Sequence, residues 1–108
     1  QFVHIGAHVI ISGGALVRKD VPPFIKAARE PLSYVGINSI GLRRRNYSND
    51  QIKQIQDIYR EIYQKGNNNS QAVERIKHTI SPSTERDEII RFIDGSDRGI
   101  IKGYFSEE

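Results

Sequence analysis

The sequence predicts a β + α fold: the end of a left-handed parallel β-helix built from hexapeptide repeats, followed by a C-terminal three-helix cap domain. Two observations predict it. Aliphatic residues among the first 21 positions recur every six residues, with glycines between them that permit tight turns. Further along, three stretches repeat apolar residues at spacings of three and four behind polar capping residues, as amphipathic helices do.

The six-residue repeat runs in two phases. They are Ile5, Ile11 and Val17, and Val3, Val9, Ala15 and Val21. A helix needs spacings of three and four and a half-buried strand needs strict alternation, so neither explains the pattern. Since one hexad forms one side of a three-sided β-helix, residues 3–21 supply roughly one coil, with the first phase facing a common interior. The alternative is a small α+β domain whose first hairpin resembles hexads.

Neighbouring coils are expected on one side of this segment only. Solenoid coils bury apolar surface against one another, and about three or more make a stable stack, so we expect coils N-terminal to Gln1. On the other side Pro22 and Pro23 end the hexads, because proline lacks the backbone donor that a sheet ladder needs. Residues 24–28 are mostly apolar, which predicts one last strand.

The chain is expected to divide into three parts. Residues 1–28 hold the final coil of the left-handed β-helix, residues 29–47 form a connecting loop with a basic run, and residues 48–108 form a C-terminal α-helical domain. The connection is predicted to be irregular, because prolines and glycines punctuate it. Ordered loops of this length are more often functional than idle.

Three helices are expected in the C-terminal part. Ser48 and Gln51 form a capping-box signature for the first, which Gly66 ends. Ser70 is expected to cap the second, and the third begins behind residues 81–83 and ends at Gly95. The residues predicted to face the core are Ile52, Ile55, Ile58, Tyr59, Ile62, Tyr63, Ala72, Val73, Ile76, Ile89, Ile90, Phe92 and Ile93. Residues 98–101 are expected to pack as a short tail.

Composition excludes several classes of protein. Without cysteine there are no disulfides and no cysteine-bearing metal sites, which fits a reducing compartment. No apolar run approaches the ~20 residues of a membrane span, and Gln1 opens no export signal, so we expect no membrane span and a cytoplasmic location. No Ser/His/Asp set, HExxH motif or Gly-rich phosphate loop appears, so no catalytic residue and no cofactor is expected here.

The three histidines have simple expected roles. His4 and His8 are four residues apart, which mimics a helical metal pair, but the segment is not helical and their rings need not converge. Each is expected to lie on the solenoid surface, and no metal is expected. His78 falls near a helix C-terminus, where a positive charge is favourable.

The basic run Arg43, Arg44 and Arg45 is the strongest chemical signal. Residues 1–47 carry seven basic and two acidic side chains, whereas residues 48–108 carry nine basic and eleven acidic ones. Guanidinium groups match phosphate in a bidentate geometry, so an anionic ligand is expected near this run. A solvated basic run ahead of a helix is the plainer alternative. Nucleic acid is not the expected partner, because no aromatic residue interleaves the arginines for base stacking.

Several strings together resemble a known family. They are Gln1-Phe2, Ile5-Gly6-Ala7-His8-Val9, Asp20-Val21-Pro22-Pro23, Gly36-Ile37-Asn38, Gly41-Leu42 with the arginines, and Arg98-Gly99. In this order they closely resemble the C-terminal part of UDP-N-acetylglucosamine O-acyltransferase, a hexapeptide-repeat acyltransferase of lipid A biosynthesis. Hexads alone would indicate only the broad acyltransferase superfamily.

The resemblance implies a homotrimer with active sites between neighbouring β-helices. There an acyl or hydroxyacyl chain moves from acyl carrier protein to the 3-hydroxyl of UDP-N-acetylglucosamine, with a histidine as general base and no metal. The family's catalytic histidine lies on earlier coils, so the resemblance implies that this chain alone is inactive. The competing class is a non-enzymatic anion-binding or protein-interaction module, and further hexads upstream would favour the enzyme.

The resemblance also assigns roles to individual residues. Gln1 matches a glutamine that lines the nucleotide site, and Asn38 matches an asparagine that meets the uridine. Arg44 and Arg45 match paired arginines near the diphosphate. Gly13 matches the position that limits how deep the acyl tail reaches.

Two places depart from the family pattern. Ile40 stands where the family often has a glutamate that engages the uracil or ribose, and isoleucine cannot accept a hydrogen bond. Residues 29–31 replace a small polar segment near the end of the acyl tail, so the length and hydroxylation of the chain stay open. We expect acidic acyl carrier protein to be attracted by the wider basic field of residues 18–45.

Overall fold

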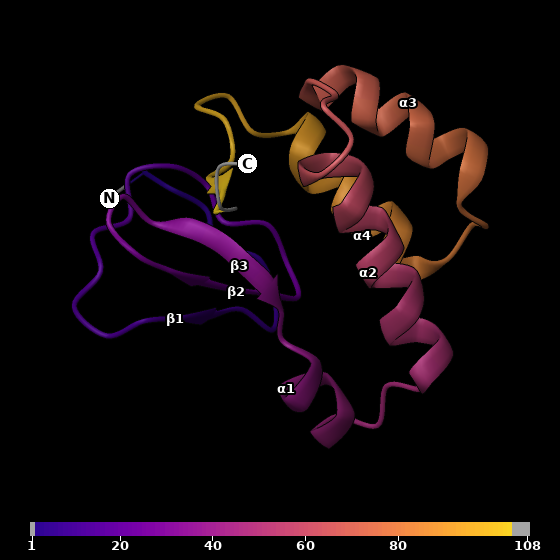
Figure 1. Ribbon diagram of the computed structural model, residues 1–108, viewed down its shortest axis with the longest axis horizontal. Coiled ribbons are helices and arrows are strands. Elements are labelled where there is room, and N and C mark those ends of the chain that lie inside the picture. The colour runs from indigo at the N-terminus through magenta and orange to yellow at the C-terminus, as the bar shows by residue number, and fades with distance from the viewer. Residues whose placement is uncertain (1, 105–108) are drawn as a thin grey trace.

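The computed structural model describes residues 2–104, so Gln1 and residues 105–108 lie outside the described chain. The elements in order are β1 Ile10–Ile11, β2 Ile25–Ala28, β3 Ser33–Ile37, α1 Ser39–Arg44, α2 Asn49–Tyr63, α3 Asn69–Thr79, α4 Thr84–Asp94 and β4 Lys102–Gly103. The strands form one sheet in the order β1-β2-β3-β4. Figure 1 shows this sheet and its loops on one side of the molecule, with α2, α3 and α4 on the other and α1 at the end of β3.

The first segment makes one coil of parallel β-structure. Ile5 pairs with Val21, and Ile10 of β1 pairs with Lys26 of β2, each pair being 16 positions apart in the sequence. Two backbone hydrogen bonds close the first rung: Gly6 N–H donates to the Val21 carbonyl (2.7 Å) and Val21 N–H donates to the His4 carbonyl (2.9 Å). The prediction of roughly one coil in residues 3–21 agrees with this pairing.

Residues of both phases of the repeat pack against the core. They are Ile11 and Val17 of the first phase, and Val9 and Ala15 of the second. Ile5 pairs with Val21 on the first rung and is 50% exposed in the described chain. The expectation that Ile5 faces the same interior stays a prediction.

The chain continues past the two prolines without leaving the stack. Pro22 and Pro23 are buried, Phe24 N–H donates to the Ala7 carbonyl (2.8 Å), and β2 then pairs in parallel with β1. This is the last strand predicted for residues 24–28. At Arg29, which has φ +83°, the chain reverses, and β3 returns antiparallel to β2.

Residues 29–47 contain more regular structure than predicted. They hold strand β3 and the six-residue helix α1, where an irregular connection was expected. Strand β3 forms because β2 offers it an antiparallel partner, which no local pattern reveals. With α1, the described residues contain four helices, one more than the three predicted.

The three longer helices begin at polar caps. The predicted capping box of α2 is present, since Gln51 N–H donates to the Ser48 hydroxyl (3.1 Å) and Ser48 N–H donates to the Gln51 side chain (2.7 Å). The predicted cap of α3 is wrong: Asn68, not Ser70, occupies that position. Asn68 and Gln71 form a reciprocal capping box, and the Asn68 cap places Ser70 inside the first turn.

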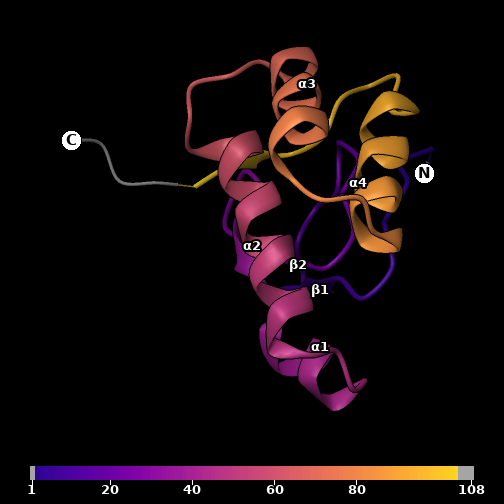
Figure 2. The same ribbon diagram turned by 90° about the vertical axis from the view of Figure 1, so that its right-hand side faces the viewer.

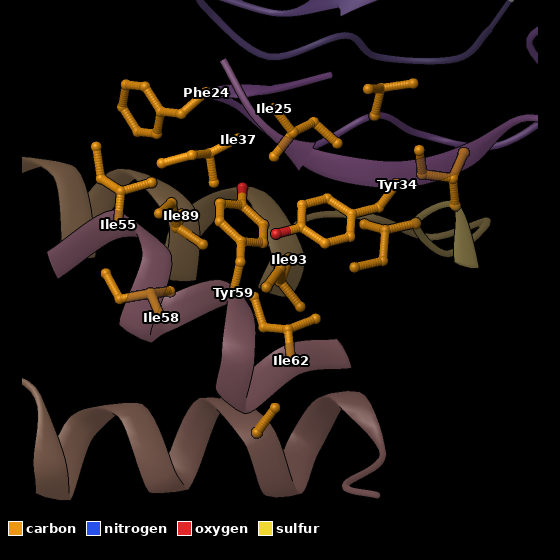
Figure 3. Close-up of a cluster of buried hydrophobic side chains, with 14 of the residues drawn as sticks. Phe24, Ile25, Tyr34, Ile37, Ile55, Ile58, Tyr59, Ile62, Ile89 and Ile93 are labelled. Carbon is orange, nitrogen blue, oxygen red and sulfur yellow. The ribbon is translucent and has the colours of Figure 1, made fainter. Parts of the chain in front are cut away.

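The sheet and the helices meet in an aromatic stack. The rings of Tyr34 from β3 and Tyr63 from α2 are 4.4 Å apart, and the ring of Tyr59 is 5.5 Å from that of Tyr34. Figure 3 shows Tyr59 reaching from α2 toward the strands among isoleucines of α2 and α4. The Tyr59 hydroxyl donates to the Pro23 carbonyl (2.6 Å), so the stack also ties α2 to the end of the coil. Burial raises the pKa of Tyr59 well above its usual value.

The C-terminal tail returns to the coil, as the view in Figure 2 also shows. Asp20 N–H donates to the Gly99 carbonyl (3.0 Å) and Ile101 N–H donates to the Asp20 carbonyl (2.9 Å), a parallel bridge beside the last rung. Ile100 and Ile101 are buried, which confirms the predicted packing of residues 98–101. None of the helices in residues 2–104 is long and apolar enough to cross a membrane.

The carboxylate of Asp20 joins three segments and is 1% exposed. It accepts hydrogen bonds from the His4 N–H (2.8 Å) and from the Ser96 hydroxyl (2.6 Å). Burial alone would raise the pKa of Asp20, but these two hydrogen bonds and the charges of His4 and Arg98 outweigh it, so the pKa lies below the usual value.

Candidate functional site

Helix α1 is anchored to the coil through Asn38, its N-cap. The Asn38 side chain accepts a hydrogen bond from the Gly41 N–H (3.2 Å) and donates one to the His8 carbonyl (3.0 Å). Gly41 is required by close packing, because a Cβ there would lie 2.5 Å from Nδ2 of Asn38. Asn38 is 6% exposed. Through its two hydrogen bonds, the residue expected to meet uridine also fixes the start of the helix.

The other end of α1 closes in a Schellman motif. Asn46 adopts φ +69°, its N–H donates to the Arg43 carbonyl (3.0 Å), and Tyr47 N–H donates to the Leu42 carbonyl (3.0 Å). Leu42 is fully buried and holds the helix against the body of the protein. The arginines therefore stand on a short, well-fixed helix, where the sequence predicted a loop.

Arg43, Arg44 and Arg45 are all exposed. Within residues 2–104, none of their guanidinium groups has a carboxylate within ion-pair distance. Arg43 and Arg44 occupy the last helical turn, where the helix dipole favours cations, and this alone would stabilise them there. Three neighbouring cations without an acidic partner nonetheless form a surface that suits an anion.

An aromatic cluster made of His8, Phe24 and Tyr47 supports this helix. The His8 ring stacks on Phe24 at 5.8 Å and meets the Tyr47 ring edge-on at 5.6 Å. Burial raises the pKa of Tyr47, with the carboxylates of Glu85 and Glu88 acting in the same direction and Arg45 opposing them. His8 was expected on the solenoid surface; it is partly buried, because it packs in this cluster.

The remaining predicted site residues lie in different surroundings. Ile40 is 64% exposed on α1, two residues after Asn38. Gly13 lies in the turn after β1, and no described atom falls within 4 Å of a Cβ built there, so this chain alone forms no wall beside it. Gln1 falls outside the described residues. Asn38, Arg44 and Arg45 are thus brought together on one helix, whereas Gly13 belongs to the coil.

A groove of about 960 Å³ lies at the turn between β2 and β3. Its lining residues are Leu16, Arg18, Lys19, Arg29, Glu30, Pro31, Leu32, Ser33, Ile101, Lys102, Gly103 and Tyr104. Arg18 pairs loosely with Glu30 (3.7 Å), and the Arg29 guanidinium lies 4.2 Å from the centre of the Tyr104 ring. The basic field of residues 18–45 is therefore divided between this groove and α1, at opposite ends of the β2–β3 hairpin.

Sequence reasoning missed part of the groove. Lys102 and Tyr104 line it because the tail returns to the hairpin, and that long-range pairing leaves no local signal. No group of three or more histidine, aspartate or glutamate side chains in residues 2–104 is arranged to hold a metal ion.

Comparisons with known proteins give one family. Residues 20–101 match the family model described as UDP-N-acetylglucosamine O-acyltransferase, domain 2. The chain is 33% identical over 102 residues to the acyl-(acyl-carrier-protein)–UDP-N-acetylglucosamine O-acyltransferase of Myxococcus xanthus, and 38% identical over 106 residues to that of Burkholderia lata. Each alignment covers 94% of this chain and 40% of the relative.

Solved structures are also similar to this one. A UDP-N-acetylglucosamine acyltransferase from Bacteroides fragilis is 48% identical with a TM-score of 0.92, over 94% of this chain and 40% of that one. The enzyme of Francisella novicida is 34% identical with a TM-score of 0.87, over 94% and 38%. The likeness confirms the predicted fold, the end of a left-handed parallel β-helix followed by a helical cap. The chain belongs to the UDP-N-acetylglucosamine O-acyltransferase family.

Proposed function

We propose that this chain is the C-terminal portion of an acyltransferase that transfers an acyl or hydroxyacyl chain from acyl carrier protein to the 3-hydroxyl of UDP-N-acetylglucosamine, the first step of lipid A biosynthesis. The observation that carries this proposal is α1, a short helix that is fixed at both ends and presents exposed arginines without acidic partners in the described chain. Relatives bearing that name support it, although the chain spans only 40% of their length.

The nucleotide is proposed to bind along α1. Arg44 and Arg45 pair with the diphosphate, and Asn38 with Gln1 contacts the nucleoside. Asn38 can do so while holding the helix, because its amide has a second N–H and its oxygen a second lone pair beyond the two hydrogen bonds already made. Exposed Ile40 places an apolar surface beside the base, so recognition of uracil is proposed to rely on packing at this position.

The acyl donor is proposed to approach the coil and the groove. Acidic acyl carrier protein is attracted by the basic residues around the groove, and Gly13 leaves room for the acyl tail. Since no atom of residues 2–104 outside the immediate chain neighbours lies within 4 Å of a Cβ built at Gly13, the other wall of the tail pocket would come from a neighbouring copy, in keeping with a homotrimer. A cytoplasmic location follows from these two substrates.

In this proposal the reaction is an acyl transfer whose general base lies outside this chain, and the three parts of the chain have separate supporting roles. A histidine on an earlier coil removes the proton of the sugar 3-hydroxyl, which attacks the thioester carbonyl, and the carrier thiol leaves. Residues 1–28 contribute the last coil, residues 29–47 the nucleotide site and residues 48–108 the cap. In this proposal the chain supplies residues that bind the substrates while the general base lies on an earlier coil, so this chain alone is expected to be inactive.

The test is to change Arg44→Ala and Arg45→Ala separately in the complete protein. A charge-assisted contact with phosphate contributes about 1.5–3 kcal/mol, so each change should raise the Michaelis constant for the UDP-sugar roughly ten- to a hundredfold. The effect should persist at high salt if the contact is desolvated, whereas arginines that only attract carrier protein should raise the carrier's constant in a salt-sensitive way. Arg91→Ala, an exposed arginine of α4, is the matched control.

A non-enzymatic anion-binding or protein-interaction module is the second candidate, favoured by the groove, which is lined by both basic and apolar residues. If both α1 substitutions leave the constant for the UDP-sugar unchanged, the nucleotide assignment of α1 is wrong. The arginines then belong to protein docking or to the solvated surface.

A further inference from the structure

We infer that His8 is a positioning residue that holds both ends of α1 on the coil, so that Arg44 and Arg45 face one diphosphate. The inference rests on the proposed function, because it assigns the arginines to the nucleotide. His8 would not touch the substrate; it would act through the helix.

The first hold is at the start of α1 and uses the backbone of His8. Its carbonyl accepts the hydrogen bond from Nδ2 of Asn38 (3.0 Å), and Oδ1 of Asn38 in turn accepts from the Gly41 N–H (3.2 Å). A chain of two hydrogen bonds therefore runs from the coil to the first turn of the helix. The nearly complete burial of Asn38 keeps water from competing for these bonds.

The second hold is at the end of α1 and uses the ring of His8. The ring meets Tyr47 edge-on at 5.6 Å, and the backbone N–H of Tyr47 bonds the Leu42 carbonyl in the Schellman motif. Phe24 stacks on the imidazole at 5.8 Å and also meets the Tyr47 ring at 6.1 Å, so the three rings contact one another. Displacing the His8 ring would therefore loosen the turn that directly follows Arg45.

The backbone conformation of His8 makes both holds possible at once. Its φ of +61° is in the left-handed region, which turns the carbonyl toward Asn38 while the ring points to Tyr47. Histidine and asparagine adopt this region more readily than most residues. Phe24 has φ +74° in the same structure, so this fold also accommodates an aromatic residue in that conformation.

The test compares two variants in the complete protein. His8→Asn keeps a residue suited to the left-handed turn but removes the ring, and His8→Phe keeps an aromatic ring. An edge-on aromatic pair predicts that His8→Asn raises the Michaelis constant for UDP-N-acetylglucosamine on the order of three- to tenfold. The kcat at saturation and the Michaelis constant for the carrier should stay within about twofold of wild type. His8→Phe should restore the constant to within about twofold of wild type.

A second readout follows the helix without the reaction. Amide hydrogen exchange of residues 39–47 should become faster in His8→Asn and stay near wild type in His8→Phe. Tyr47→Leu should accelerate exchange at least as much, because it removes the contacts of Tyr47 with both His8 and Phe24. Adding His8→Asn to Tyr47→Leu should have a smaller effect than His8→Asn alone, because the contact between the two rings is already lost. His78→Ala, at an exposed histidine of α3, should leave both Michaelis constants, kcat and the exchange of residues 39–47 unchanged.

The outcomes separate this inference from the proposed function. If Arg44→Ala and Arg45→Ala weaken UDP-sugar binding but His8→Asn changes neither binding nor exchange, the positioning role is wrong and the nucleotide assignment stands. If exchange accelerates while the arginine variants bind normally, His8 holds the helix but the helix does not hold the nucleotide. Equal losses in His8→Asn and His8→Phe would show that the ring is not the relevant group.

Discussion

Gly41 is the residue on which the geometry of α1 depends most closely. The side chain of Asn38 occupies the space that any other residue at position 41 would need. A glycine inside a helix normally costs stability relative to alanine, so close packing and not local preference accounts for it here.

Gly41→Ala is therefore expected to destabilise the protein. The forced displacement of Asn38 should cost about 1–3 kcal/mol, against the ~1 kcal/mol that alanine gains over glycine in a helix, so the net loss should be up to about 2 kcal/mol. Denaturant unfolding of the complete protein measures the difference. Gly13→Ala is the matched control, since its Cβ meets nothing within 4 Å, and equal stability of the two variants would contradict the packing explanation.

Gly13 is expected to influence which length of acyl chain the complete enzyme prefers. Gly13→Met should shift the preference of the complete enzyme toward shorter acyl donors, because the new side chain would fill the space of several methylenes, each worth ~0.8 kcal/mol when buried. Relative kcat/KM values for a series of acyl carrier protein thioesters measure this. An unchanged ranking of donors would show that Gly13 does not face the acyl chain.

The candidate site could be predicted from the sequence only in part. The basic run was visible as a charge pattern, and the resemblance to the family singled out Asn38, Arg44 and Arg45. The hydrogen bond from Asn38 to the His8 carbonyl could not be predicted, because it joins residues 30 positions apart and depends on a left-handed backbone at His8.

At the scale of elements, the start of α3 shows which of two polar residues caps the helix. Local preference allows either Asn68 or Ser70 as the cap, and the structure uses Asn68 with Gln71 as its reciprocal partner. Gln71 is three residues after Asn68, which is the spacing of a capping box.

Asn68→Ala should therefore lower the unfolding free energy by about 1 kcal/mol, since it leaves helix N–H groups without a partner. Ser70→Ala should change it by less than about 0.5 kcal/mol, because this residue is an exposed position of the first turn. The two melting temperatures, compared in the same buffer, decide the matter. A larger loss of stability in Ser70→Ala than in Asn68→Ala would show that Ser70 is the N-cap.

The helices were predictable and the sheet was less so, for a physical reason. Helices α2 and α4 carry their signals within one segment: a cap, an apolar face and a terminating glycine. Strands β3 and β4 exist because distant segments pair with them, and α1 has only six residues and depends on contacts with the coil. Periodicity detects local order, whereas these elements depend on tertiary contacts.

Over the whole molecule, Asp20 ties the first rung, the end of the coil and the tail together. Its hydrogen bonds to His4 and Ser96 lower its pKa in the folded protein despite burial. The folded state thus binds fewer protons than the unfolded state between the lowered value and the unfolded value of about 3.9. The stability that Asp20 contributes should be complete above the unfolded pKa and should be lost as pH falls through the folded pKa.

Asp20→Asn is expected to cost about 1.5–3 kcal/mol at neutral pH, because it replaces charge-assisted hydrogen bonds. The gap in unfolding free energy between wild type and this variant should close as the pH is lowered through the acid range, and denaturation curves at a series of pH values measure it. A gap that is independent of pH would show that the charge of Asp20 does not contribute.

The same junction determines the order in which the protein can fold. Asp20 meets Ser96, a residue 76 positions later in the chain, and pairs with the segment just beyond it. Closing so long a loop costs conformational entropy before the contacts at Asp20 can form. This step should therefore be slow compared with formation of α2 and α4, whose backbone hydrogen bonds join residues close in sequence. A growing polypeptide would have its helices in place while the rung at Asp20 is still open. Pulsed hydrogen exchange during refolding should then protect the amides of α2 first and those of Asp20 and Ile101 last.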